Sequence, residues 1–162
     1  MTAEMMLFTI SKIAVDPCVA PNVIEQYHLL DNQRGGIYGT WHSRRINNNP
    51  YPWFSSTLDQ VQQAAGHLET AQWWFNCAAL GDENRWHSHN PYKWAGVLYI
   101  QMPPLAGAIE FKRKAEFHTQ IPEVGDFLLF SGGLAHRVHK NLSQDYRITA
   151  AFNFVEKSTN AS

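Results

Sequence analysis

Three histidines in the second half of the chain have the spacing to build one face of a metal site. His87 and His89 flank Ser88, and residues i and i+2 of an extended segment point to the same side, so both imidazoles can reach one ion. His136 lies in a later strand, after the turn 131–133 (Ser-Gly-Gly). Three ligands on one face leave three positions open for water, a co-substrate and O2, as in the facial triad of non-haem iron enzymes.

Arg147, eleven residues after His136, could hold a carboxylate beside that metal, because a guanidinium pairs with a carboxylate through two parallel hydrogen bonds. For a single arginine, a surface salt bridge is the simpler interpretation. The strand that contains Arg147 argues against it, because side chains alternate between the two faces of a strand and Arg147 lies on the face opposite an apolar one. One face has small and polar side chains and one cation: Arg147, Thr149, Ala151 and Asn153. The other face is apolar: Ile148, Ala150, Phe152 and Phe154. The polar face suits a ligand cavity, and the apolar face requires cover from another element.

Short strands at regular spacing, separated by glycine and proline, must position these residues. They are predicted at Gln72–Leu80, Trp94–Met102, Gly107–Phe111, Phe117–Gln120, Asp126–Phe130, Ala135–His139 and Tyr146–Val155, with a turn at Gly81–Arg85. Such spacing indicates a β-sandwich or barrel rather than an α/β sheet. His139 could also face inward, but the glycine turn favours His136 as the ligand.

The N-terminal part has a mixed pattern. We predict a strand over Met6–Val15, a helix from Pro21 to Leu30 with Gly35-Gly36 beyond its end, and a strand over Tyr38–Ile46. Ser56 or Thr57 would cap a second helix reaching about His67, with Leu58, Val61, Ala65 and Leu68 on one stripe. The predicted fold is an all-β core, a double-stranded β-helix (jelly roll, cupin-like), with two N-terminal helices packed on it. We expect a single domain over 1–162, with an N-terminal cover (1–70), a jelly-roll core (71–155) and a tail (156–162).

Composition and charge indicate where in the cell the protein is expected and which partners are not expected. A formal net charge of -1 gives no electrostatic reason to bind nucleic acid or a membrane, and no apolar run approaches the length of a bilayer span. No signal peptide is visible, because the apolar stretch Met5–Val15 is short, interrupted and without a basic flank. Cys18 and Cys77 do not form a disulfide framework, so we expect a cytoplasmic protein. Exposed sheet edges would allow a homodimer.

The run from Trp74 to Val155 resembles the 2-oxoglutarate- and Fe(II)-dependent oxygenases, most closely a small bacterial and phage branch. The matching segments are Asn76, Gly81 through His87-Ser88-His89-Asn90-Pro91, Ala95–Tyr99, Pro122 with Gly125–Phe130, His136 and Arg147–Asn153. The most specific part is His136 followed by Arg147 and Thr149, which matches a distal histidine followed by Arg-x-Ser/Thr.

The resemblance implies a set of site residues. His87, His89 and His136 would hold Fe(II), and 2-oxoglutarate and O2 would be the co-substrates. Arg147 would bind the C5 carboxylate of 2-oxoglutarate. The other expected co-substrate contacts are polar residues of the core strands: Thr149, Tyr99, Asn76 and Asn153. The product chemistry would be hydroxylation of a substrate with release of succinate and CO2.

One departure from the family pattern concerns the middle ligand. The superfamily usually has His-x-Asp or His-x-Glu, whereas this chain has His89 at the second position. Three neutral imidazoles would leave the full +2 charge on the metal. Either His89 replaces the carboxylate, which we favour, or a nearby acid such as Asp82 or Glu83 supplies it.

Two other functions fit parts of the pattern. Gly81, His87-x-His89, Gly125, Gly133 and His136 also resemble the two cupin motifs, and three-His cupin dioxygenases need no 2-oxoglutarate. That interpretation gives Arg147 no role, and Lys93 and Trp94 stand where the cupin glutamate is expected. A non-catalytic ligand-binding β-domain would instead use exposed aromatics, namely Trp41, Tyr51, Trp53 and Trp86, with the segment 38–54 as a ligand platform or a substrate lid. The substrate itself, a small molecule or a peptidyl side chain, cannot be read from the sequence.

Overall fold

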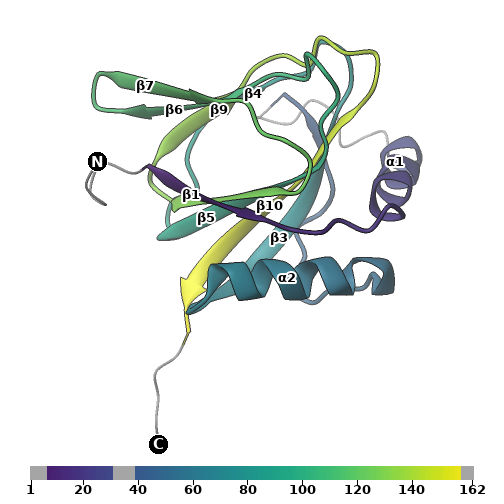
Figure 1. Ribbon diagram of the computed structural model, residues 1–162, viewed down its shortest axis with the longest axis horizontal. Helices are drawn as coiled ribbons and strands as arrows, with labels where there is room; N and C mark the ends of the chain where they lie inside the picture. Colours follow the sequence, from purple (N-terminus) through teal and green to yellow (C-terminus); the bar gives the residue numbers. More distant parts are fainter. Residues whose placement is uncertain (1–6, 31–38, 158–162) are drawn as a thin grey trace, which may run out of the picture.

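The computed structural model describes residues 7–30 and 39–157, and within these ranges the chain forms two antiparallel sheets that face each other (Figure 1). The six-stranded major sheet has the order β1 (Phe8–Lys12), β8 (Asp126–Ser131), β5 (Trp94–Gln101), β10 (Arg147–Glu156), β3 (Leu68–Ala78) and β2 (Trp41–His42). The four-stranded minor sheet has the order β4 (Asn84–His87), β9 (Ala135–Val138), β6 (Ile109–Arg113) and β7 (Glu116–Gln120). The predicted jelly-roll fold is confirmed.

Two helices cover the outer face of the major sheet, as predicted (Figure 1). They are α1 (Val19–Leu29) and α2 (Ser55–Ala65), the latter following the 3-10 turn η3 (Pro52–Phe54). The main core joins apolar residues of both helices to the apolar face of β10: Val19, Val23, Val61, Ile148, Ala150, Phe152 and Phe154. Burying this face of β10 turns the opposite face, with Arg147, toward the space between the sheets.

The boundary between α2 and β3 differs from the prediction. The helix ends at Ala65, because Gly66 adopts a positive φ of 65° that stops the helix, and the strand starts at Leu68. Leu68 was predicted on the helical stripe, so that assignment is wrong, and β3 begins four residues before the predicted Gln72. The helix also starts at Ser55 without a side-chain cap, because η3 runs directly into it.

The N-terminal segments do more than cover the core. β1 pairs with β8, and β2 pairs with β3, so they form the two edges of the major sheet. The predicted strand over 38–46 is reduced to β2 and one bridge between Ile46 and Trp73. The helix α1 begins two residues before Pro21, which stands in the first turn, where a missing N–H costs little. Met6, Gly35-Gly36, Tyr38 and the tail from residue 158 lie outside the described residues.

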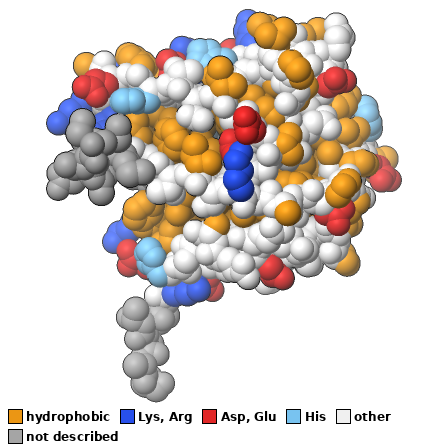
Figure 2. All heavy atoms as spheres, viewed as in Figure 1, with side chains coloured by type: hydrophobic (Ala, Val, Ile, Leu, Met, Phe, Trp, Pro, Cys, Tyr) orange, Lys and Arg blue, Asp and Glu red, His pale blue; other side chains and the backbone are white. Residues whose placement is uncertain are grey.

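The remaining strand predictions hold with shifts of one or two residues at their ends, except that β1 ends three residues before the predicted Val15 and β4 begins inside the predicted turn. Side chains from both sheets fill one part of the space between them: Ala95, Tyr99, Ile109, Phe111, Leu128 and Phe130. The rest of that space is the cavity described below. On the face drawn in Figure 2, charged side chains of both signs are scattered among hydrophobic and neutral polar ones.

Neither helix within the described ranges is long and apolar enough to cross a membrane, each having 11 residues. The two cysteines are free: Cys77 is buried and Cys18 is half-buried.

Candidate metal centre

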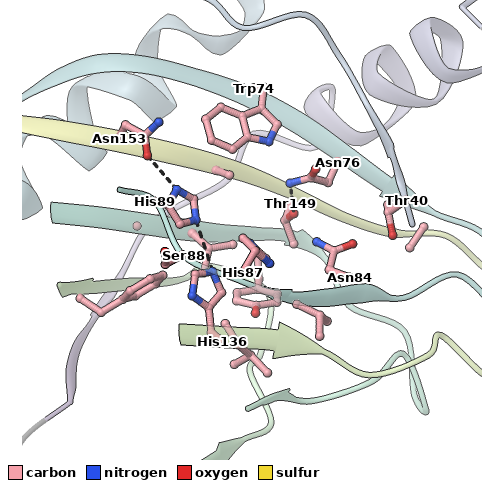
Figure 3. Close-up of a pocket in the computed structure, with 18 of the residues that line it drawn as sticks. Thr40, Trp74, Asn76, Asn84, His87, Ser88, His89, His136, Thr149 and Asn153 are labelled. Carbon is pink, nitrogen blue, oxygen red and sulfur yellow. Dashed lines mark hydrogen bonds between the residues drawn. The ribbon is translucent and has the colours of Figure 1, made fainter. Parts of the chain in front are cut away.

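The three predicted histidines meet at one end of the cavity between the sheets (Figure 3). His87 ends β4 and is the direct partner of His136 on β9. His89 follows in the loop after β4, where its backbone N–H donates to the Gly132 carbonyl at 2.7 Å. A Cβ on Gly132 would lie 1.9 Å from the Tyr92 carbonyl oxygen, so only glycine fits here. The glycine turn before His136 therefore also positions His89.

Each imidazole uses its Nδ1 in a hydrogen bond to an oxygen. The acceptors are the Arg85 carbonyl for His87 (2.7 Å), the Asn153 Oδ1 for His89 (2.7 Å) and the Leu134 carbonyl for His136 (2.9 Å). A carbonyl acceptor requires the hydrogen on Nδ1, which leaves a lone pair on Nε2. This tautomer is the one that a metal-binding histidine adopts when a second group orients it.

The Nε2 lone pairs converge on one point. One ligand nitrogen from each ring lies within 4.8 Å of the others, and the Nε2 atoms of His89 and His136 are 3.3 Å apart. Two lone pairs cannot hydrogen-bond each other, so a cation is needed between them. Adjacent nitrogens of an octahedral ion, each about 2.1 Å from it, are about 3 Å apart. The donor set therefore fits a divalent transition metal.

Burial keeps the three imidazoles neutral. It lowers the pKa of His89 to about 4. The hydrogen bond to Asn153 acts to raise this pKa, whereas the nearby His87 and Arg45 lower it further. Burial also lowers the pKa of His87, and it lowers that of His136 well below its ordinary value, helped by the other two imidazoles. Neutral histidines are the form that binds metal, so no proton has to leave at neutral pH.

The lowered pKa of His89 predicts how stability depends on pH. Its folded pKa of about 4 lies below the ordinary 6.5, so between these values the unfolded chain binds more protons than the folded one. The free energy of unfolding of the metal-free protein should therefore fall as pH drops from 6.5 to about 4, by about 3 kcal/mol for this group. Urea titrations at several pH values measure this free energy of unfolding. If His89→Gln showed the same pH dependence as the wild type, His89 would not be the group responsible.

The two acids considered as middle ligands lie elsewhere. Among the described residues, the three histidines form the only group of three or more potential ligands whose donor atoms converge. The Asp82 carboxylate instead accepts a hydrogen bond from the Ala79 backbone N–H at 2.9 Å, and Glu83 offers its carbonyl to the Thr40 hydroxyl. His89 is therefore the middle ligand that the geometry favours.

Asn153, one of the residues expected to contact the co-substrate, lies beside His89 (Figure 3), six residues from Arg147 along β10. Replacing Asn153 by alanine removes the acceptor that orients His89, so metal affinity should fall about 10- to 100-fold. Asn153→Asp retains a hydrogen-bond acceptor at the same place, so its metal affinity should fall much less. Metal titrations of both variants check this, and equal losses would show that the amide oxygen does not orient the ring.

Arg147 is buried at the first position of β10 and lines the same cavity. Its Nη1 donates to the carbonyls of Ala106 and His139, the latter at 2.9 Å. Gly107 makes room for it: its φ is +97°, and a Cβ there would lie 2.9 Å from Nη1. No described carboxylate forms an ion pair with Arg147, which rules out the alternative of a surface salt bridge. Burial lowers its pKa, but a guanidinium stays charged in proteins.

Polar side chains line the wall beside Arg147. Thr149 on β10 is paired with Tyr99 on β5 and with Asn76 on β3, so the three form a row across the major sheet. The Asn76 amide donates to the Thr149 hydroxyl at 3.2 Å, which leaves that hydroxyl hydrogen available to a ligand. Burial raises the pKa of Tyr99, which stays a neutral phenol. Asn84, also in the wall, has a buried Oδ1 with no described partner.

Two cavity residues were not identified from the sequence. Trp74 stacks on His89 with ring centroids 5.8 Å apart, and the Arg45 guanidinium lies over the Trp74 ring, 4.1 Å from its centroid. Strand alternation back from Asn76 could have placed Trp74 on the cavity face, whereas nothing local marks Arg45. Of the four aromatics considered as an exposed binding face, Trp41 is buried and Tyr51 and Trp53 pack against the core, whereas Trp86 is exposed.

The other histidines lie outside the triad. His139, the alternative ligand, has its Nε2 3.4 Å from Glu110, a residue that faces away from the cavity on β6. His118 lies beside Glu116 on the exposed strand β7. His28 makes edge-to-face contacts with the rings of Tyr27 and Tyr146, and a ring nitrogen of His42 is hydrogen-bonded to the Ser43 carbonyl.

Known proteins share the fold of this chain but little of its sequence. No protein-family model matches the sequence, and no curated protein matches it. A Pseudomonas putida prolyl-4-hydroxylase has a TM-score of 0.66 at 14% identity, over 96% of this chain and 95% of its own. A Burkholderia pseudomallei oxidoreductase of the 2OG-Fe(II) oxygenase family has a TM-score of 0.67 at 10% identity, over 93% and 85%.

A third similar structure is a Trichoplax adhaerens prolyl hydroxylase in complex with a hypoxia inducible factor peptide fragment. Its TM-score is 0.63 at 14% identity, over 94% of this chain and 85% of its own. Together, the geometry and these comparisons bear out the resemblance at the level of the fold: this chain has the fold of the 2-oxoglutarate- and Fe(II)-dependent oxygenases.

Proposed function

We propose that the protein is an Fe(II)- and 2-oxoglutarate-dependent dioxygenase. The observation that carries this proposal is the common cavity, which is lined both by the three histidines and by Arg147, a buried cation with no carboxylate partner among the described residues. A metal site alone would fit many functions. A charged arginine left unpaired beside it requires an anion, and 2-oxoglutarate provides one.

The histidines would hold the metal through Nε2. When bound, Fe(II) supplies the redox chemistry that couples O2 and the oxidative decarboxylation of 2-oxoglutarate, giving succinate and CO2, to hydroxylation of a substrate C–H bond. The chain contributes fixed ligands, because each Nδ1 is held by an oxygen. Phe130 and Val138 add apolar walls that limit the access of water.

Arg147 would bind the C5 carboxylate of 2-oxoglutarate. Its Nη1 is engaged by two carbonyls, so the remaining N–H groups are the ones that can face the ligand. The Thr149 hydroxyl and the neutral Tyr99 phenol lie in the same wall and would donate to the same carboxylate. A carboxylate held by several donors in a buried site is well fixed, which orients the keto acid toward the histidines.

The primary substrate is proposed to be a small molecule or a peptidyl side chain. Two of the similar structures are prolyl hydroxylases, one of them in complex with a peptide fragment, which supports the peptidyl option.

The test is turnover of 2-oxoglutarate by the Fe(II)-loaded protein in air. We expect slow formation of succinate and CO2 in equal amounts without a substrate, and faster formation when a substrate is added. The reaction should stop on chelation of the metal. Metal-dependent O2 consumption without succinate would instead support a three-His dioxygenase that needs no 2-oxoglutarate. No metal binding would leave a ligand-binding domain.

A further inference from the structure

Arg45 is a second cation of the cavity, and the sheet holds it in place. Its backbone lies between two pairs of hydrogen bonds to β3: Ser43 bonds Phe75 through its N–H and its hydroxyl, and Ile46 exchanges N–H···O bonds of 2.8 and 3.0 Å with Trp73. The Cζ atom of the guanidinium lies over the Trp74 ring, 4.1 Å from its centroid, and Arg45 lines the cavity. An exposed arginine held in this way is preorganised to bind a ligand.

The contact with Trp74 leaves N–H donors of Arg45 available to a ligand. A cation–π contact does not use the five N–H groups of a guanidinium in conventional hydrogen bonds, so they can hold an oxyanion bidentately. In the described ranges, no carboxylate forms an ion pair with Arg45. The charge is therefore available to a ligand that enters the cavity.

Arg45 and Arg147 occupy different positions along the sheet. Trp74, on which Arg45 lies, is paired with Ala151, whereas Arg147 is paired with Ala78. The two positions are four residues apart along β10, or about 13 Å. His89 also stacks on Trp74, so Arg45 lies on the histidine side of the cavity. Arg45 is therefore separate from the position at which Arg147 would hold the C5 carboxylate of 2-oxoglutarate.

We propose that Arg45 is a specificity-determining residue that binds an oxyanion, a carboxylate or a phosphate, of the primary substrate. This inference rests on the proposed function for the identity of the reaction, but the anion site itself does not require it. The substrate would enter beside Trp74, with its anionic group on Arg45 and the group to be hydroxylated next to the histidines.

The test is calorimetric titration of the Fe(II)-loaded protein without O2 and with saturating 2-oxoglutarate, so that Arg147 is occupied and no turnover occurs. The probes are matched pairs: N-acetyl aspartate and glutamate amides against their asparagine and glutamine counterparts, and N-acetyl phosphoserine amide against the serine form. We expect at least one acidic probe to bind tenfold or more tightly than its neutral partner. The carboxylate and phosphate pairs then identify which oxyanion is preferred.

Two variants localise the effect. Arg45→Gln should abolish the preference for acidic probes, whereas Arg44→Gln should keep it, because Arg44 is an equally charged, exposed neighbour that does not line the cavity. The proposal is overturned if the wild type shows no acidic preference, or if both variants lose it equally. If 2-oxoglutarate itself does not bind, the proposed function fails, and the same probes without 2-oxoglutarate still test Arg45.

Discussion

Replacing His136 by alanine is expected to abolish stable metal binding and all 2-oxoglutarate turnover. The variant removes one of three nitrogen donors, and its Nε2 lies only 3.3 Å from that of His89. Loss of an outer partner of a ligand already costs about 10- to 100-fold in affinity, so loss of a ligand should cost more. Metal content after dialysis, measured by elemental analysis, and succinate formation report the two effects.

His139→Ala is the matched control, because this histidine is three residues away but its side chain lies against Glu110, outside the triad. It should retain metal and activity. Circular dichroism of both variants verifies that they fold. Full metal occupancy in folded His136→Ala would exclude His136 as a ligand.

Arg147→Ala should weaken 2-oxoglutarate binding without removing the metal. Truncating one partner of a buried, hydrogen-bonded charge pair costs about 2–5 kcal/mol, which corresponds to about a 30- to 5,000-fold higher Kd. Calorimetry of the Fe(II)-loaded protein without O2 gives the Kd directly. The control is Arg137→Ala, since Arg137 points away from the cavity, pairs with Glu110 and lies over Trp86. An unchanged Kd in Arg147→Ala would mean that another group holds the C5 carboxylate.

The absence of a carboxylate from the described ligand set has an electrostatic consequence. Three neutral imidazoles do not offset the charge of a divalent ion, and Arg147 and Arg45 add two positive charges to the lining of the same cavity. Charges in a cavity with low-dielectric walls interact strongly, so the site favours anionic ligands. A dianionic co-substrate and an anionic primary substrate would together offset this charge.

The positions of the core strands along the chain and the cavity face of β10 could be predicted because alternation and turn residues are local signals. Arg147 and Thr149 alternate with Ile148 and Ala150, and only one register buries the apolar set under the helices. The convergence of His87, His89 and His136 needed the resemblance as well, since the sequence alone does not show which strands are neighbours.

Other features depended on tertiary structure and could not be read locally. The helical stripe that ran on to Leu68 was misleading, because the left-handed backbone of Gly66 ends α2 and releases Leu68 into β3. Asn153 shares the strand face with Arg147, but the length of β10 places it beside His89 instead. Arg45 reaches the cavity because its neighbours Ser43 and Ile46 pair with β3, and these are contacts between distant parts of the chain.

The central claim is that the three histidines and Arg147 together bind Fe(II) and 2-oxoglutarate. The most direct measurement is a titration of the Fe(II)-loaded protein with 2-oxoglutarate, without O2, followed by visible absorption. We predict a new absorption band that saturates at one 2-oxoglutarate per iron. The band should be absent with Zn(II) and in His136→Ala, and should require far more 2-oxoglutarate in Arg147→Ala. Fully bound iron without any new band would contradict the account.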